Sequence, residues 1–287
     1  MRERRKRRRK STERPPRRAF VSLPRMSDPT HRRIAEQFGA QARNYAMSRT
    51  HNDGYTRLLL LEHLQPIADE IALDVACGAG GTTLALAPYV QRVIGLDLAP
   101  EMLAATRLAA RRAEAAHVQL VRGDVHALPF PDRSLDLAVA RAAPHHFADP
   151  ARAIREMARV LKRGGRLGIA DGTVPDDAEL DAFVNALDVL HDPTTVRNYS
   201  EHEWRGFVEG AGLRVDRVVA EAWDLAEGRT LNEWMSRSGA SSERIAAARA
   251  RLLEAPKRVR DYLRVKAEDD DVRFDLPKIV LVATRPD

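Results

Sequence analysis

The residues best placed to do chemistry are a loop of small residues and three aspartates nearby in the sequence. The loop, residues 73–82 (LDVACGAGGT), leads from a short apolar run into a helical pattern and contains the first of these acids, Asp74. Asp97 ends the next apolar run, and Asp124 follows the third. Because small residues let a backbone approach a ligand closely, and a helix N-terminus offers free amide donors, this loop is suited to a ligand with an anionic group.

The three aspartates favour a nucleoside as that ligand. Asp97 is placed to accept hydrogen bonds from both hydroxyls of a ribose, and Asp124 to accept one from an adenine amine. A dinucleotide fingerprint asks for a third glycine where this chain has Thr83, and no phosphate-binding GxxxxGK[S/T] run is present. Asp74 disfavours a polyphosphate. S-adenosylmethionine, with a positive sulfonium, an ammonium and one carboxylate, therefore fits better than NAD or ATP.

The order of apolar runs and helical patterns predicts the scaffold that positions these residues. We expect helices at 80–87, 100–116 and 150–161, the last capped by Gly164–Gly165, between strands at 71–75, 92–97, 118–122, 135–141 and 166–170. An amphipathic helical region interrupted at Gly39 and 51–54 precedes them, and a helix at 200–211 and strands at 213–220 and 278–283 follow. This alternation predicts an α/β fold with a mostly parallel sheet covered on both faces.

Two inserts interrupt the alternation. Residues 172–199 contain an amphipathic helix that ends at 191–193, and residues 226–276 carry a helical segment rich in Ala, Arg and Glu. Both follow strands whose carboxyl ends lie on the ligand side of an open α/β sheet. We expect these inserts to form a helical lid that closes an apolar chamber for a second, small or lipid-like molecule.

Charge is distributed unevenly along the 287 residues. Residues 1–18 hold eleven Lys or Arg against two Glu, a local net charge of +9, which leaves −3 for the rest because the whole chain carries +6. We expect residues 1–25 to be a disordered basic tail, either an electrostatic arm or a dispensable extension before Met26. The mildly acidic body lacks the charge pattern of a nucleic-acid reader, so no nucleic-acid partner is expected for the folded domain.

Composition excludes several other classes of protein. A single cysteine excludes an internal disulfide framework and a multi-cysteine zinc or iron–sulfur site, and no metal site is predicted. No apolar run reaches the roughly 18–20 residues that a membrane-spanning helix requires. Because the tail also lacks the apolar stretch of a secretory signal, a cytoplasmic location is expected. The sequence carries no signal of an oligomeric state.

Several motifs together resemble one family of enzymes. They are the loop at 73–82, GLDLAPEML at 95–103, GDVHALPFPDRSLD at 123–136, RAAPHHF at 141–147, RVLKRGG at 159–165 and FGAQARNY at 38–45. In combination they resemble the class I S-adenosylmethionine-dependent methyltransferases, in the branch that contains the ubiquinone/menaquinone C-methyltransferases. The resemblance covers roughly residues 34–220 and the final strand. It is specific for fold and cofactor, and leaves the methyl acceptor open.

This resemblance implies a seven-stranded Rossmann-like methyltransferase fold with an antiparallel last strand, formed by residues 26–287 with the helical inserts. It also implies S-adenosylmethionine as cofactor, bound by Tyr45, Asp74, Ala76, Gly78, Gly80, Asp97, Leu98, Met102, Asp124, Val125 and Arg141. Within this set, Asp74, Gly78, Gly80 and Arg141 face the methionine part, Asp97 the ribose, and Met102, Asp124 and Val125 the adenine. Ala76 departs from the family pattern, which usually has a glycine at that position.

His145 and His146 follow the fourth strand at the ligand edge and are the candidate catalytic residues. An imidazole titrates near neutral pH, so either one can act as general base toward a phenol, enol or acidic carbon. The alternative is that one packs and the other caps a turn. His191 and Arg197 are weaker candidates for lining the acceptor site, and Cys77 and the tryptophans are expected to pack.

The function predicted from these residues is methyl transfer to a small organic acceptor, at a phenolic, quinone-like or enol carbon or oxygen. Two other functions stay open. One is an RNA or protein methyltransferase that docks its substrate with the basic tail. The other is a protein that binds S-adenosylmethionine without turning it over.

Overall fold

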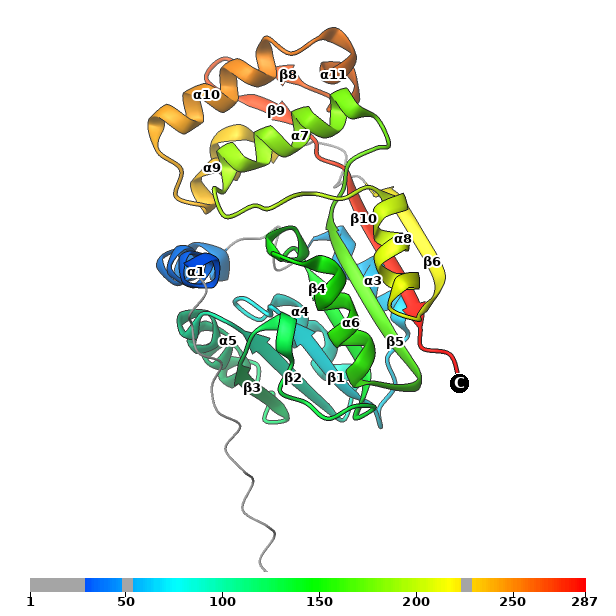
Figure 1. Cartoon of the computed structure of the whole chain (residues 1–287). Coiled ribbons are helices and arrows are strands. Elements are labelled where there is room, and N and C mark those ends of the chain that lie inside the picture. The colour runs from blue at the N-terminus through cyan, green and yellow to red at the C-terminus, as the bar shows by residue number, and fades with distance from the viewer. Residues whose placement is uncertain (1–28, 48–53, 223–228) are drawn as a thin grey trace, which may run out of the picture.

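A computed structural model describes residues 29–47, 54–222 and 229–287 (Figure 1). The predicted basic tail lies outside these residues. At the centre is a seven-stranded sheet of order β3-β2-β1-β4-β5-β10-β6. Its strands are β1 (Ile71–Val75), β2 (Arg92–Asp97), β3 (Val118–Arg122), β4 (Leu135–Arg141), β5 (Leu161–Gly172), β6 (Arg214–Ala222) and β10 (Lys278–Thr284). Only β10 is antiparallel to its neighbours, β5 and β6, which confirms the predicted topology.

Helices cover both faces of this sheet, because alternate strand residues point to opposite sides. On one face Leu73 and Val75 pack with Ile154 of α6 (Pro150–Val160) and Trp204 of α8 (Glu201–Gly210). On the other, Ala72 packs with residues of α3 (Tyr55–Leu64) and α4 (Gly81–Leu86). The helix after β2, α5 (Pro100–Arg112), is shorter than the predicted 100–116. Within the described ranges no helix is long and apolar enough to span a membrane.

The N-terminal helix α1 (Pro29–Met47) runs through Gly39, which was predicted to interrupt it. A Cβ at Gly39 would lie 2.8 Å from Oε2 of Glu101 in α5. The glycine therefore serves close packing of α1 on α5, and the helix continues past it.

The predicted cap at Gly164–Gly165 is wrong. Helix α6 ends at Val160, and Leu161 already has extended backbone as the first residue of β5. Nη1 of Arg285 donates to the carbonyl oxygens of Ala158, Arg159 and Leu161 at 2.7, 3.0 and 2.8 Å. The guanidinium thus satisfies the carbonyls that a glycine cap would otherwise serve.

The two inserts form a separate layer above the carboxyl edge of the sheet (Figure 1). The first insert supplies α7 (Ala178–His191); the second supplies α9 (Leu231–Arg237), α10 (Ser242–Leu253) and α11 (Lys257–Tyr262). The second insert also contains a small antiparallel sheet, which was not predicted, of β7 (Arg229–Thr230), β9 (Val272–Phe274) and β8 (Lys266–Ala267). Leu187, Met235, Leu252 and Phe274 are fully or almost fully buried in the shared core of this layer. We call it the insert layer.

We predict that Arg285→Met destabilises the protein by about 1.5–3 kcal/mol, because a hydrogen-bonded charged group is lost from the end of α6. Urea unfolding followed by circular dichroism measures this difference. The matched control is Arg214→Met, whose guanidinium is largely exposed and makes one ion pair, with Asp216. The control should change the free energy of unfolding by less than about 0.5 kcal/mol. Equal effects of the two substitutions would contradict the capping role.

Candidate functional site

The loop between β1 and α4 has the tight backbone that its small residues predict. Ala76, Gly78 and Gly80 all have positive φ, of 54°, 55° and 93°. A Cβ at Gly80 would lie 2.8 Å from Cγ2 of Thr106, so only glycine fits there. Ala76 adopts the same left-handed region with a side chain, in the position where the resemblance expected glycine. The loop backbone is therefore left-handed at position 76 with alanine, as it is at the two glycines.

Asp97 ties this loop to the end of β2. Its Oδ2 accepts a hydrogen bond from the amide of Gly78 at 2.8 Å, and its Oδ1 accepts one from Ala99 at 2.9 Å. Thr106 Oγ1 donates to the carbonyl oxygen of Gly78 at 2.6 Å. Burial raises the pKa of Asp97, while the backbone donors act in the opposite direction. Asp97 is thus a positioning residue for the loop as well as a candidate ligand group.

Asp74 is the most deeply buried of the three predicted acids. Its side chain is at the end of β1, and its Oδ2 accepts a hydrogen bond from Thr83 Oγ1 at 2.6 Å. Burial raises the pKa of Asp74 to about 7, against the opposing effects of the Thr83 hydrogen bond and the Arg141 charge. Thr83, which excluded the dinucleotide pattern, therefore has a structural role in orienting this carboxyl.

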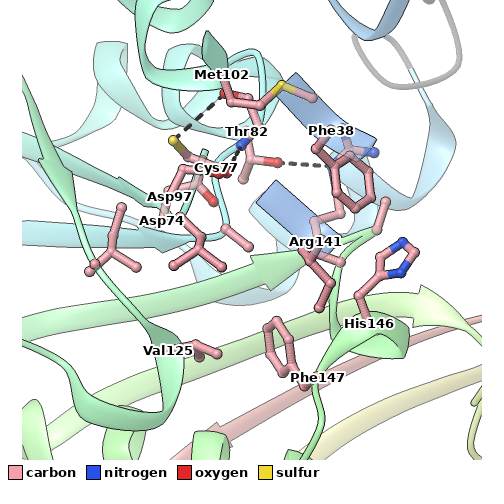
Figure 2. Close-up of a pocket in the computed structure, with 18 of the residues that line it drawn as sticks. Phe38, Asp74, Cys77, Thr82, Asp97, Met102, Val125, Arg141, His146 and Phe147 are labelled. Atoms are coloured by element: carbon pink, nitrogen blue, oxygen red, sulfur yellow. Dashed lines mark hydrogen bonds between the residues drawn. The ribbon is translucent and has the colours of Figure 1, made fainter. Parts of the chain in front are cut away.

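These residues surround a cavity of about 1020 Å3, its mouth included (Figure 2). The predicted residues that line it are Asp74, Ala76, Gly78, Asp97, Leu98, Met102, Asp124, Val125, Arg141 and His146. Gly80, at the N-terminus of α4, is not among the lining residues, and Tyr45 is in α1 with a side chain outside the described set. Ile34 and Phe38 of α1 also line the cavity and were not predicted. In Figure 2, Phe38 and His146 stand opposite Asp74 and Asp97.

Asp124 has a protein partner that the sequence reasoning missed. Its Oδ1 accepts a hydrogen bond from the amide of His126 at 2.9 Å and lies 2.8 Å from Nδ1 of the same residue. Met102 and Val125, the other two residues assigned to adenine by the resemblance, are buried and line the same cavity. Cys77 is buried, and burial raises the pKa of its thiol, which fits the expected packing role.

A second cavity of about 760 Å3, its mouth included, lies between the sheet edge and the insert layer. Arg141, Ala142 and His146 line both cavities, so the two meet at the carboxyl end of β4. The other walls of the second cavity include His145, Asp171, Asp188, His191, Asp192, Trp234, Arg237 and Lys278. This lining corrects the prediction of an apolar chamber, because the inserts bring charged side chains to it.

His145 faces this second cavity with a carboxylate behind it. Its Nδ1 lies 2.7 Å from Oδ1 of Asp171, and its backbone amide donates to Oδ2 of Asp171 at 2.7 Å. Burial lowers the pKa of His145, but the charge and hydrogen bond of Asp171 outweigh it and leave that pKa above its ordinary value. Burial acts to raise the pKa of Asp171, and the adjacent His145 nevertheless holds it below its usual range. Asp171 was missed, although it is an acid near the end of a strand like the three that were predicted.

His146 has the opposite electrostatic environment. Burial, with the nearby charge of His145, lowers the pKa of His146 to about 4. Thr194 Oγ1 donates to Asp192 at 2.7 Å and lies 3.2 Å from Nδ1 of His146. Since that hydroxyl has one proton to give, it accepts from His146, which places the proton of the neutral ring on Nδ1. The His146 ring also packs edge-on against Phe38, with centroids 4.8 Å apart.

Of the two weaker candidates for the acceptor site, His191 and Arg197, only His191 lines the second cavity. His191 lines the second cavity and stacks on Trp234 with ring centroids 4.2 Å apart. Arg197 pairs with Asp181 at 2.8 Å and does not line either cavity. Trp204 and Trp234 are buried packing residues, as expected, and Trp223 lies outside the described residues.

Comparisons with known proteins agree with this geometry. The model of the methyltransferase domain family matches residues 73–169. The methyltransferase YcgJ of Bacillus subtilis is 34% identical over 224 residues, which span 78% of this chain and 87% of that protein. Its crystal structure superposes with a TM-score of 0.74 over 81% of this chain and 99% of that one, at 31% identity.

Two further relatives are more distant. A demethylmenaquinone methyltransferase of Corynebacterium kroppenstedtii is 33% identical over 148 residues, or 50% of this chain and 62% of that protein. The geranyl diphosphate C-methyltransferase of Streptomyces coelicolor, solved with S-adenosyl-L-homocysteine, has a TM-score of 0.65 at 16% identity, over 91% of this chain and all of that one, and shows the shared fold. With the seven-stranded sheet, the glycine-containing loop and the YcgJ match, the chain belongs to the class I S-adenosylmethionine-dependent methyltransferases.

Proposed function

We propose that the enzyme methylates a small organic acceptor at a phenolic, quinone-like or enol carbon or oxygen, with the acceptor in the second cavity. The observation that carries this proposal is the meeting of the two cavities at Arg141, Ala142 and His146. A methyl donor in the first cavity and an acceptor in the second can face each other across that junction. The demethylmenaquinone methyltransferase relative supports a quinone-like reacting centre.

We assign cofactor binding to the residues around the first cavity. In this proposal Asp97 and Leu98 hold the ribose, and Met102, Asp124 and Val125 enclose the adenine. Asp74, Ala76, Gly78, Gly80 and Arg141 address the methionine part, and Tyr45 of α1 helps to close the pocket. The depth and polarity of the Asp74 and Asp97 positions fit a cationic nucleoside, because a buried carboxylate favours an adjacent positive charge.

Bound S-adenosylmethionine supplies an activated methyl group on a positive sulfur. The protein's main task is then alignment, which contributes up to about 7–11 kcal/mol at its limit. We assign the general base to His145, whose Nε2 would take the proton that the acceptor loses when it is methylated. Asp171 holds the ring by its Nδ1 and stabilises the imidazolium. His146, neutral at physiological pH, lines the junction without competing for the proton.

We further propose that residues 26–287 form the complete catalytic domain and that residues 1–25 are dispensable for catalysis. An RNA or protein acceptor would depend on the basic residues 1–18, which lie outside the described structure. Binding without turnover needs no second cavity. The cavity between sheet and insert layer favours the enzyme.

The first prediction from the proposed function tests the cofactor site. Asp97→Ala should weaken S-adenosylhomocysteine binding by about 10- to 100-fold, as expected for lost hydrogen bonds to a charged group, with calorimetry as the measurement. The control is Asp69→Ala, an exposed acid in the turn before β1, which should leave the affinity unchanged. An unchanged affinity in Asp97→Ala would refute the assignment.

The second prediction concerns pH. The pKa of Asp74 is raised to about 7 in the free protein, so its carboxyl is mostly protonated below that pH. The cationic methionine part of S-adenosylmethionine favours the ionised form of the Asp74 carboxyl. The binding of S-adenosylmethionine should therefore tighten by about tenfold as pH rises from 5.5 to 7.5. Asp74→Asn should flatten this dependence. A similar slope in both proteins would show that Asp74 does not face the cation.

The third prediction separates the two histidines. We expect His145→Ala to lower kcat by about 100- to 10,000-fold, whereas His146→Ala mainly disturbs alignment and His202→Ala, a surface control, has no effect. Label transfer from S-adenosylmethionine to a metabolite extract, read by mass spectrometry as a gain of one CH2, identifies the substrate for these assays. Unchanged turnover in the His145→Ala/His146→Ala double variant would remove the base from the mechanism.

Asp171→Asn provides a separate test of positioning. Because Asp171 raises the pKa of His145, its loss should shift the acidic limb of the kcat–pH profile to lower pH, in addition to lowering the maximum. A merely structural role for Asp171 would lower activity without moving that limb.

A further inference from the structure

One carboxylate in the second cavity has an oxygen without a partner. Asp192 is 1% exposed and follows helix α7 in the first insert. Its Oδ1 accepts hydrogen bonds from the amide and the hydroxyl of Thr194 at 2.8 and 2.7 Å. Its Oδ2 is buried and has no hydrogen-bond partner among the described residues. Buried carboxylate oxygens are costly to leave unsatisfied, so this atom is suited to a donor that enters the cavity with a ligand or an ordered water.

The other two acids of the cavity differ from Asp192 in this respect. Asp171 uses both oxygens on His145. Asp188 Oδ2 accepts a hydrogen bond from Asn198 Nδ2 at 2.7 Å, and Asn198 is in turn held by the side chain of Asn185. Of the three aspartates that line this cavity, Asp192, in the loop after α7, is therefore the one whose buried oxygen has no hydrogen-bond partner among the described residues.

We infer that the acceptor is a small water-soluble molecule that carries a hydrogen-bond donor, an ammonium or a hydroxyl, besides the atom that is methylated. Asp192 Oδ2 binds this donor. The inference rests on the proposed methyl transfer. The His145 base and Asp192 line the same cavity, so one small molecule can reach both. The stacked pair His191 and Trp234 adds an aromatic part to the same wall.

The charge of the lining argues against a long apolar acceptor. Asp188, Asp192, Arg237 and Lys278 all border the cavity. An isoprenoid tail placed against the partly exposed Arg237 and Lys278 would remove their water and return no hydrogen bond, which is unfavourable for both charged groups. A compact polar molecule replaces the lost water contacts with its own donors and acceptors.

The first experiment asks which kind of molecule is methylated. A cell extract is partitioned between water and hexane, and each phase is incubated with the full-length enzyme and labelled S-adenosylmethionine. We expect label in products of the aqueous phase; retention of the acceptor on a cation exchanger would indicate an ammonium, and flow-through a hydroxyl. Label confined to the hexane phase would overturn this inference and leave the methyltransferase function intact. No label in either phase, with cofactor binding intact, would contradict the proposed function itself.

The second experiment tests Asp192 with the aqueous acceptor. Asp192→Asn keeps the oxygen that Thr194 uses and replaces the other by an amide donor, so it should raise KM by about 10- to 100-fold while kcat changes by less than about threefold. Glu179→Gln, an exposed acid in helix α7 of the same insert and outside the cavity, is the matched control and should leave KM unchanged. Unchanged cofactor affinity in both variants shows that they are folded. If Asp192→Asn has the same KM as the wild type, Oδ2 serves only an internal water and the inference is wrong.

Discussion

The hydrogen bond from the Gly78 amide to Asp97 is the interaction on which the rest of the site depends. It joins the loop after β1 to the end of β2 and fixes a backbone that passes through the left-handed region at Ala76, Gly78 and Gly80. A non-glycine residue in that region costs roughly 1–2 kcal/mol. The carboxylate of Asp97, together with Thr106 on the Gly78 carbonyl, offsets that cost locally. The loop can therefore keep an alanine at position 76 and still leave room for a ligand against its backbone.

Different partners give the neighbouring His145 and His146 opposite shifts in pKa. His145 and His146 are consecutive, yet a direct carboxylate raises the pKa of the first, while burial and its neighbour's charge lower that of the second to about 4. The separation follows from which partner each ring reaches: Asp171 touches His145, but Asp192 reaches His146 only through the Thr194 hydroxyl. Pairs of groups driven apart in this way commonly divide acid–base work. In the proposed mechanism His145 accepts a proton, and His146 stays neutral and lines the cavity.

The sequence predicted the parts of this site that follow from strand order. Asp74, Asp97 and Asp124 end neighbouring strands, and parallel strands bring their carboxyl ends to one edge, so their gathering required no tertiary information. The same rule applied to β5 would have found Asp171. Other features depend on contacts between distant segments: Arg285 caps α6 from the far end of the chain, and Gly39 lies against Glu101. A local glycine pattern could not show that Arg285 already satisfied the end of α6, which is why the predicted cap at Gly164–Gly165 failed.

The polarity of the second cavity could not be predicted from the sequence for a related reason. The insert segments have the sequence pattern of amphipathic helices. Their apolar faces do form a core, but that core lies inside the insert layer. What the layer presents to the sheet is the polar end of α7 and the loop after it, including Asp188 and Asp192. The sheet edge thus carries the first cavity and His145, and the inserts supply charged residues to the wall of the second cavity. Thr194 links Asp192 to His146 at the junction of the two cavities, so the first insert and the sheet edge share one hydrogen-bond chain there.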